Sequence, residues 1–376
     1  MSTKVNIPIF KLEFEESFIE EFLSGARDIL SSGRPLAEGH YVQQFCEEFK
    51  SINGSEYCIM ISNGTAALEI ALKSLPKQGK VIVPTNTFFA TSIAVENSGN
   101  ELVLADSNQI DFGVNYNEIE KLILNNSDIV AVVVVHIGGI ISSDIFRIQR
   151  LCQDNGVYLI EDAAHAHFSS LNGVNAGNFG DIGCFSLFPT KVMTSGEGGI
   201  AVTNNRNLYD KMRSLKNFGR DLSDASLCVT KGGNNFKVTE LQALQALLDL
   251  RRVKSRILRR NELLEIYEDN LDPNKFRLVR QESGICASYK AIVRQVNGVD
   301  IELQRKMKLR GISMTGKVYD IPVHKQPAYL HQFRDLHFPI ADNFAREHVC
   351  PPLYPELTET EVMLIAKAMN ESTNEN

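Results

Sequence analysis

Short apolar, β-rich runs alternate with helix-patterned stretches through the first two-thirds of the chain, and this alternation constrains the fold more than any other feature. Several runs are almost continuously apolar, as expected of strands that helices cover on both faces. Amphipathic helices are predicted between them, for example over 65–75 and 144–155. Strands separated by helices imply a mainly parallel seven-stranded sheet sandwiched by helices, an α/β fold. The predicted strands are 57–62, 81–84, 102–106, 129–136, 157–162, 182–187 and 199–203.

A smaller domain is predicted to follow this sheet. The pattern is helical over about 238–271, and a helix or helix pair of that length often links two domains. Beyond it, strand candidates alternate with helices, which predicts a smaller C-terminal α/β domain. We therefore expect a large domain over 1–250 and a small domain over 251–376. The candidates in the small domain are the strands 288–294 and 312–319, the helices 299–309 and 358–370, and an irregular polar tail at 371–376.

The composition favours a globular protein that binds neither nucleic acid nor membrane. The formal net charge is −7, and the basic cluster at 251–260 is interpreted as the solvated face of a helix. The N-terminus lacks the pattern of a signal peptide, and no apolar run reaches the roughly 18 residues that span a bilayer. The seven scattered cysteines include no C-x-x-C pair, which favours reduced thiols over disulfides or a zinc site. We expect a cytoplasmic protein without a metal.

Two residues have the chemistry of an acid and a nucleophile. Asp162 ends the apolar run VYLIED, and polar groups at the carboxyl ends of parallel strands face the ligand crevice. It could equally cap a helix. Lys191 lies among apolar residues and glycines in FSLFPTKVMTSGEGG. Burial there would lower its pKa and make it an amine nucleophile toward an aldehyde, although such a lysine could also extend its head to solvent.

A phosphate site is predicted where SNGTAALEIAL leaves a strand, turns at Gly64 and opens a helix at Thr65. This geometry points free N–H groups and the positive helix end at one spot, although an ordinary helix cap would look the same. Ser186 could add a hydroxyl donor to the phosphate or satisfy a strand end. Phe88, just past the run 81–84, could stack on a planar ligand or pack in the core.

These features are most informative together. One sheet would offer a phosphate cradle, an aromatic ring, an acid and a lysine, each near the carboxyl end of a strand. This set suits a phosphorylated pyridine aldehyde, with Asp162 at the ring nitrogen and Lys191 at the aldehyde. The cofactor predicted from these residues is pyridoxal 5'-phosphate, which alternates with its amine form, pyridoxamine phosphate.

The chain resembles the DegT/DnrJ/EryC1/StrS family of sugar aminotransferases, within the fold-type I, aspartate aminotransferase-like, pyridoxal-phosphate enzymes. The similarity runs over nearly the whole chain. Two segments together are highly specific, and they read EDAAHA and GDIGCFSLFPTK; others are SNGTAALEIAL, VPTNTFFATSIAV, GGNNFKVTELQAL and DIPVHKQPAY. The resemblance implies that Lys191 and Asp162 are catalytic. It also implies that Phe88 stacks on the cofactor ring and that the phosphate is bound by Gly64, Thr65 and Ser186.

The resemblance implies further roles at positions that the pattern alone does not single out. Asn235 matches an asparagine that reaches the phosphate from the neighbouring subunit, which implies a homodimer with shared active sites. His165 stands where the family often has glutamine, near the phenolic oxygen of the cofactor. Lys237 replaces the usual arginine of an N-Y-R motif, so a bidentate contact is lost. His324 matches a position near the acceptor site that the partner subunit is also expected to contribute, and we expect it, with Lys237, to bind substrate.

The reaction implied by the resemblance has two stages. An amino acid, for which L-glutamate is the expected donor, gives its amino group to the cofactor, and a keto-sugar then accepts it. A nucleotide-linked sugar for cell-surface polysaccharide or lipopolysaccharide is the family default. Three alternatives stay open: a keto-sugar acid of the octulosonate type as acceptor, a sugar dehydratase, and a non-catalytic regulator. Lys191 favours transamination, because dehydratases of this kind carry histidine in its place.

Overall fold

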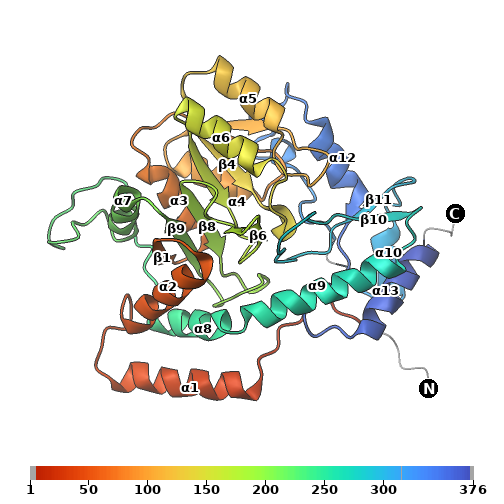
Figure 1. Ribbon diagram of the computed structural model, residues 1–376, viewed down its shortest axis with the longest axis horizontal. Helices are drawn as coiled ribbons and strands as arrows, with labels where there is room; N and C mark the ends of the chain where they lie inside the picture. Colours follow the sequence, from red (N-terminus) through yellow and green to blue (C-terminus); the bar gives the residue numbers. More distant parts are fainter. Residues whose placement is uncertain (1–5, 315, 373–376) are drawn as a thin grey trace.

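A mixed β-sheet forms the centre of the computed structural model, which describes residues 6–314 and 316–372 (Figure 1). The spatial order of its strands is β1–β9–β8–β5–β4–β2–β3. All seven predicted strands are confirmed, with no end displaced by more than one residue. They are β1 (Tyr57–Ile61), β2 (Lys80–Pro84), β3 (Glu101–Ala105), β4 (Ile129–Val135), β5 (Tyr158–Asp162), β8 (Ile182–Ser186) and β9 (Gly199–Thr203).

The sheet is mainly parallel, as predicted. The pairs β2–β3, β2–β4, β4–β5 and β5–β8 are parallel, whereas β9 runs antiparallel to both of its neighbours, β8 and β1. No helix separates β8 from β9, so the chain turns straight back through a loop. This loop carries Lys191 past the carboxyl end of β8.

Helices cover both faces of the sheet, and each face has its own apolar core. On one face, Met60 and Val132 pack with residues of α2 (His40–Asn53), α5 (Tyr116–Asn125), α6 (Ile145–Asn155) and α8 (Glu240–Leu250). On the other, Ile61 and Val133 pack with α3 (Gly64–Ser74), α4 (Phe89–Asn97) and α7 (Arg206–Lys216). The continuous apolar runs of the strands follow from this burial on both sides.

The long helical stretch predicted over 238–271 is a helix pair. Helix α8 ends at Leu250, and α9 (Val253–Asn270) leads on to the C-terminal elements (Figure 1). The N-terminal α1 (Glu16–Ser31) lies outside α8, where Phe18 packs on Leu248. The interpretation of 251–260 as a solvated face is wrong for Arg260, which is buried and donates to main-chain carbonyls. Its place on the core side of α9 explains the difference.

The C-terminal part forms a three-stranded antiparallel sheet of β10 (Phe276–Leu278), β11 (Val293–Gln295) and β12 (His348–Val349), with helices α10 (Leu303–Leu309) and α13 (Glu359–Ser372). Both helix predictions are confirmed, although α10 begins later than expected. Two strand predictions are wrong over most of their length. Only residues 293–294 of 288–294 form a strand. The segment 312–319, of which 315 lies outside the described residues, makes only isolated bridges, from Ile312 to Ile7 and from Gly316 to Cys350.

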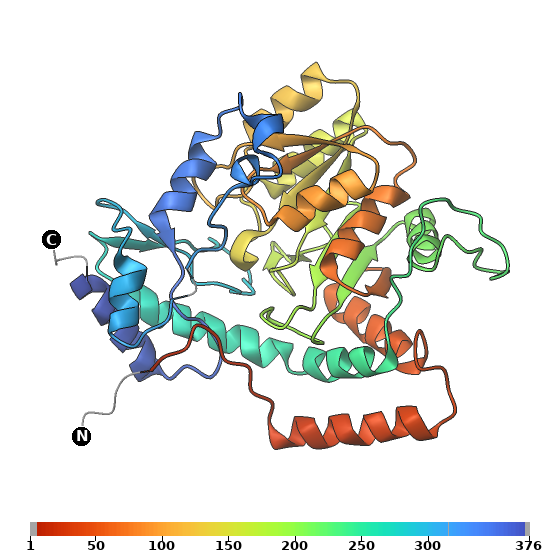
Figure 2. The same ribbon diagram turned by 180° about the vertical axis from the view of Figure 1, so that it is seen from behind.

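Part of the C-terminal region returns to the large sheet. Val323 and Phe338 share an apolar core with β2 and α3, on the face where Figure 2 shows the blue segment beside the orange helices. The predicted domain boundary at 250/251 coincides with the break between α8 and α9, and the division stays a prediction. The remaining elements are η1 (Ile137–Gly139), β6 (Ser170–Leu171), β7 (Val174–Asn175), η2 (Val323–Lys325), α11 (Leu330–Phe333) and α12 (Pro339–Glu347).

The end of the chain differs in part from the expectation. Helix α13 extends to Ser372, so the first two residues of the polar tail are helical, and 373–376 lie outside the described residues. Across the described part of the chain, none of the helices combines the length and apolar character needed to cross a bilayer.

Candidate active site

A cavity of about 810 Å³ opens at the carboxyl ends of β1, β4, β5 and β8. Strands that are far apart in the sequence end at this edge of the sheet. Open α/β sheets bind their ligands at this edge. The cavity brings together seven of the ten predicted site residues, which are Gly64, Thr65, Phe88, Asp162, His165, Ser186 and Lys191.

The predicted phosphate cradle has the shape that an anion requires. The side chain of Asn63 accepts from the N–H of Ala66 and so begins α3. The N–H groups of Gly64 and Thr65 belong to the first turn, where no intrahelical acceptor exists, and they stay free for a ligand. A Cβ atom at Gly64 would lie 2.9 Å from the Cβ of Ser186, so only glycine lets this turn approach the end of β8.

Asp162 is held rigidly at the floor of the cavity. Its side chain is only 7% exposed, and its carboxylate accepts from the Thr91 hydroxyl at 2.7 Å and from the Ala164 N–H at 3.2 Å. Burial raises the pKa of Asp162, and the hydrogen bond from Thr91 opposes that rise. Such a carboxylate is stabilised in its charged form when a cation, such as a protonated pyridine, approaches it.

Lys191 lies in the loop between β8 and β9, and α8 anchors that loop. The N–H of Thr194 donates to the buried Asp249 at 2.8 Å, and Asp249 is paired with Arg256 at 2.5 Å. Burial lowers the pKa of Lys191 to about 8, while Asp162 opposes the shift. The neutral, nucleophilic amine is therefore a much larger fraction of this side chain near neutral pH than it is of an exposed lysine.

His165 is a neutral imidazole with a defined orientation. Burial lowers the pKa of His165 well below its usual value, and the charge of Lys191 lowers it further. Its Nδ1 accepts from the N–H of Gly138 at 3.3 Å, so Nε2 carries the proton. The ring stacks on Tyr289, with 4.2 Å between the centroids. Nε2–H is thus the group that His165 can offer to a ligand.

Phe88 also lines the cavity, but at its open side. Its ring is 52% exposed and packs against Phe89, with 4.1 Å between the centroids. An exposed aromatic ring beside a buried acid and a lysine can cover one face of a planar ligand.

Three predicted residues do not line this cavity in the single chain. Asn235 and Lys237 contact each other in the exposed segment that joins α7 to α8. His324 is buried between the large sheet and α12, where Nδ1 lies 2.7 Å from the Thr85 hydroxyl and Nε2 lies 3.3 Å from Asp342. Both ring nitrogens are engaged in the single chain, and the substrate role of His324, expected in the site of the partner subunit, stays a prediction.

The structure adds residues that the sequence did not indicate. Thr91 supports Asp162, and Tyr289 stacks on His165 and lies under the Lys191 ammonium, 4.8 Å from nitrogen to ring centroid. Lys290 and Tyr319 line the same cavity. The threonine follows the strand 81–84 within PTNTFFAT and could have been suspected. The other three come from the C-terminal part and carried no motif.

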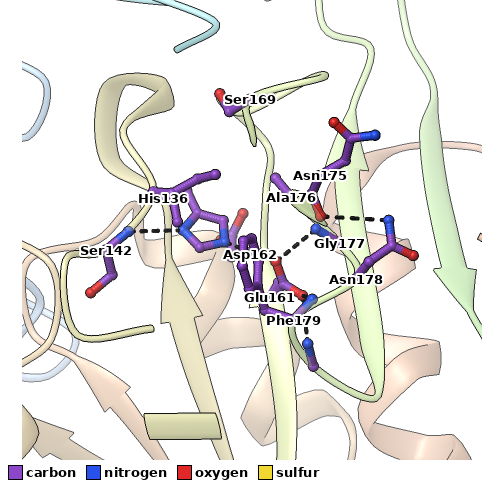
Figure 3. Close-up of polar contacts among 12 residues, drawn as sticks. His136, Ser142, Glu161, Asp162, Ser169, Asn175, Ala176, Gly177, Asn178 and Phe179 are labelled. Carbon is purple, nitrogen blue, oxygen red and sulfur yellow. Dashed lines mark hydrogen bonds and ion pairs between the residues drawn. The ribbon is translucent and has the colours of Figure 1, made fainter. Parts of the chain in front are cut away.

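Behind the cavity, Glu161 forms a second polar cluster that Figure 3 shows in detail. Its fully buried carboxylate accepts from His136 Nε2 at 2.9 Å and from the N–H of Gly177 at 2.6 Å. It also accepts from the N–H groups of Phe179 and Gly180, each at 2.7 Å. The cluster fixes the turn that precedes β8.

The fold and cavity define a class: an α/β protein with a site for a phosphorylated pyridine aldehyde, built on a lysine, an aspartate and a helix N-terminus. Within residues 6–314 and 316–372, no group of three or more His, Cys, Asp or Glu is placed to hold a metal ion. The residues that line the cavity fit pyridoxal phosphate, because a buried carboxylate, a lysine and the free N–H groups at the start of α3 lie in one cavity.

Comparison with known proteins identifies the family. The sequence profile of the DegT/DnrJ/EryC1/StrS aminotransferase family matches residues 16–370, and the chain belongs to this family. It is 31% identical to the GDP-perosamine synthase of Escherichia coli O157:H7, over 89% of this chain and 91% of that protein. It is 30% identical to a UDP-N-acetyl-3-dehydro-alpha-D-glucosamine 3-aminotransferase of Acidithiobacillus ferrooxidans, over 92% of each.

A solved structure agrees with the same assignment. DesV of S. venezuelae, in complex with a ketimine intermediate, superposes with a TM-score of 0.90 at 26% identity, covering 99% of this chain and all of that one. The predicted class is confirmed: this is a sugar aminotransferase fold and family, with pyridoxal phosphate as the cofactor.

Proposed function

We propose that this enzyme moves the amino group of L-glutamate to a nucleotide-linked keto-sugar, for the synthesis of a cell-surface polysaccharide. The observation that carries the proposal is the placement of Lys191 and Asp162 in one cavity below the N-terminus of α3. The similarity to enzymes named for GDP- and UDP-linked sugars supports a nucleotide-linked acceptor.

Each residue of the site has a defined task in this reaction. Pyridoxal phosphate supplies the aldehyde that accepts the amino group and the ring that withdraws electrons from the reacting carbon. Lys191 Nζ would be the amine that holds the aldehyde of the bound cofactor, and when free it would take up and return the proton that moves during the transfer. Asp162 would keep a proton on the ring nitrogen, and the free N–H groups of Gly64 and Thr65 would hold the phosphate. Nε2–H of His165 would be available to the phenolic oxygen.

The test is to load the protein with pyridoxamine phosphate and offer it a panel of keto-sugars. The true acceptor should restore the absorbance of the aldehyde form and yield an amino-sugar. The panel should contain nucleotide-linked 3-keto and 4-keto hexoses together with an octulosonate-type sugar acid. A response to the sugar acid alone would overturn the nucleotide-linked assignment. Release of a dehydrated sugar without stoichiometric loss of glutamate would identify a dehydratase instead.

We further propose a homodimer in which Asn235 and Lys237 complete the active site of the partner subunit. Neither residue lines the cavity of its own chain, although Phe236 between them does, and both lie at the α8 end of the segment that joins α7 to α8. Part of this segment stands away from the body of the molecule (Figure 1). That segment exposes large apolar side chains, which an interface would cover: Phe218, Leu222, Leu227 and Val229.

Complementation tests the shared site. Lys191→Ala and Asn235→Asp variants, each weakly active or inactive alone, should regain activity when they are unfolded and refolded together. Hybrid dimers then hold one intact site, so about a quarter of the wild-type activity is expected. A mixture no more active than its two components would refute the shared site. We place the enzyme in the cytoplasm, in keeping with its seven free thiols, and cell fractionation tests this.

A further inference from the structure

Lys290 is a half-buried lysine that lines the cavity, and in the part of the chain that the structure describes its ammonium has no anionic partner, only the face of the Tyr289 ring. Among the described residues, no hydrogen bond or ion pair is formed by its ammonium. The other two cavity lysines are provided for: Lys191 has the opposite charge of Asp162 nearby, and Lys317 donates to the main-chain carbonyls of Ala345 and Arg346 at the end of α12. An unpaired ammonium in a cavity is costly unless a ligand compensates it.

The segment that carries Lys290 is held firmly. The N–H groups of Tyr289 and Lys290 both point to the carbonyl of Gly138, at 2.8 and 3.4 Å. From below, the buried Arg260 donates to the carbonyls of Ser288 and Tyr289, both at 3.4 Å. Ser288 has a left-handed φ of 53°, which breaks the strand expected here and turns Lys290 toward the cavity. Lys290 is therefore presented by a fixed main chain.

Lys290 also lies near the reacting nitrogen. The ammonium of Lys191 is 4.8 Å from the centroid of the Tyr289 ring, and that of Lys290 is 5.0 Å from the same centroid. The two nitrogens are thus no more than about 10 Å apart. If Lys191 held the cofactor and Asp162 met its ring nitrogen, Lys290 would remain a cation without an anionic partner, within about 10 Å of the Lys191 nitrogen.

We propose that Lys290 binds a carboxylate of the amino-acid donor, and of the 2-oxo acid that it becomes, and so selects the donor of this aminotransferase. This inference rests on the proposed function. An amino-acid donor carries a carboxylate on the carbon that reacts, so the first stage of the reaction places an anion within reach of Lys290.

A compact anion fits the site better than the diphosphate of a nucleotide-linked sugar. A diphosphate carries more than one charge and is usually bound by several cations or N–H groups, whereas one ammonium matches one carboxylate. Burial lowers the pKa of Lys290, the Cys350 thiol opposes that lowering, and Arg260 adds to it; no carboxylate is among the groups that act on it. The residue is therefore not the member of an internal ion pair that a ligand would have to break.

Kinetics of the two half-reactions in the Lys290→Met holoenzyme show whether Lys290 binds the carboxylate of the donor or the diphosphate of the sugar. In the first, L-glutamate is titrated against the pyridoxal-phosphate form; in the second, the keto-sugar is titrated against the pyridoxamine-phosphate form. We expect the concentration of glutamate for half-saturation to rise by at least about tenfold and that of the sugar to change by less than about twofold. Lys290→Arg should recover most of the glutamate affinity, because it keeps the charge.

Lys211→Met is the matched control, since Lys211 is also half-buried, also has its pKa lowered by burial, and lies outside the cavity. It should leave both half-reactions within about twofold of wild type. Removal of an unpaired, partly buried charge should leave Lys290→Met at least as thermally stable as the wild type, which separates a binding role from a structural one. A loss confined to the sugar half-reaction, an equal loss in both, or no loss would each overturn the proposal. A wild-type protein that takes up no pyridoxal phosphate would refute the proposed function itself.

Discussion

Glu161 and Asp162 are neighbouring carboxylates at the end of β5, and the structure uses them in opposite ways. Glu161 accepts four hydrogen bonds and is fully buried on the face covered by α6. Asp162 points to the other face, accepts two, and keeps part of its carboxylate open to the cavity. Because successive side chains of a strand alternate between faces, one residue step separates a structural carboxylate from a reactive one.

The difference shows what makes a buried acid available for chemistry. The four donors around Glu161 satisfy the carboxylate completely, and it holds His136 and the turn at 177–180 in place. Asp162 has unsatisfied capacity and a pKa raised by burial, so it gains from an incoming cation. The functional site is thus expected around the carboxylate that has fewer hydrogen-bond donors. Variants of Asp162 should lose activity, and variants of Glu161 should lose folding stability.

The largest expected effect is on the cavity side, at the nucleophile. Lys191→Ala should lower transamination by at least about 10⁴-fold, because it removes both the attacking amine and the proton carrier. The variant should still bind the cofactor noncovalently through the cradle at α3, which equilibrium dialysis would measure. Lys211→Ala serves as the control. Full activity of the Lys191 variant would end the assignment.

Asp162→Asn should follow, with a loss of about 10³-fold in kcat and a smaller loss of folding stability than in Glu161→Gln, because Asp162 accepts two hydrogen bonds and Glu161 accepts four. Asparagine keeps the size and can accept from Thr91, but it cannot hold a proton on the ring nitrogen. Steady-state kinetics and urea unfolding of the same preparation measure both quantities. Activity above a tenth of the wild type would show that the carboxylate charge is dispensable.

Glu161→Gln should show the reverse pattern, a loss of about 3 kcal/mol in the free energy of unfolding. Main-chain N–H groups donate to both carboxylate oxygens of Glu161. In glutamine one of these oxygens is replaced by an NH₂ group, which cannot accept their hydrogen bonds. Urea unfolding measures the loss. Glu47→Gln, at an exposed residue paired with Lys50, should change stability by less than about 0.5 kcal/mol. An unchanged stability in Glu161→Gln would break the contrast between the two carboxylates.

The smallest effect is expected for Thr91→Val, at about tenfold in kcat/KM with a shift in pH dependence. The Thr91 hydroxyl donates to ionised Asp162 and lowers its pKa, so its removal raises that pKa. As the pH is lowered, Asp162 of the variant is protonated at a higher pH than in the wild type. The acid limb of the rate profile therefore shifts to higher pH. Thr91→Ser keeps the hydroxyl and should retain the wild-type profile. An unmoved limb in Thr91→Val would contradict this role.

The C-terminal part shows where sequence patterns fail. The strands of the large sheet are covered on both faces, so their apolar runs predicted them to within one residue. Residues 288–290 and 312–319 are also apolar in part, yet their main chains bond to single partners such as Gly138, Ile7 and Cys350. Such contacts are made with segments that are distant in the sequence. The spacing of apolar residues within 288–290 and 312–319 therefore cannot predict them.

By itself the sequence determined the central sheet, the turn at Gly64 and the chemistry of Lys191 and Asp162, because periodic burial and strand ends are local properties of the chain. Only the tertiary structure decided which groups surround that chemistry. Thr91 reaches the cavity from α4, and the neighbouring residues Tyr289 and Lys290 reach it from the C-terminal part. In its own chain His324 lies outside the cavity, where it contacts Thr85 and Asp342. The physical reason is that desolvation and charge pairing depend on segments that meet only when the chain is folded.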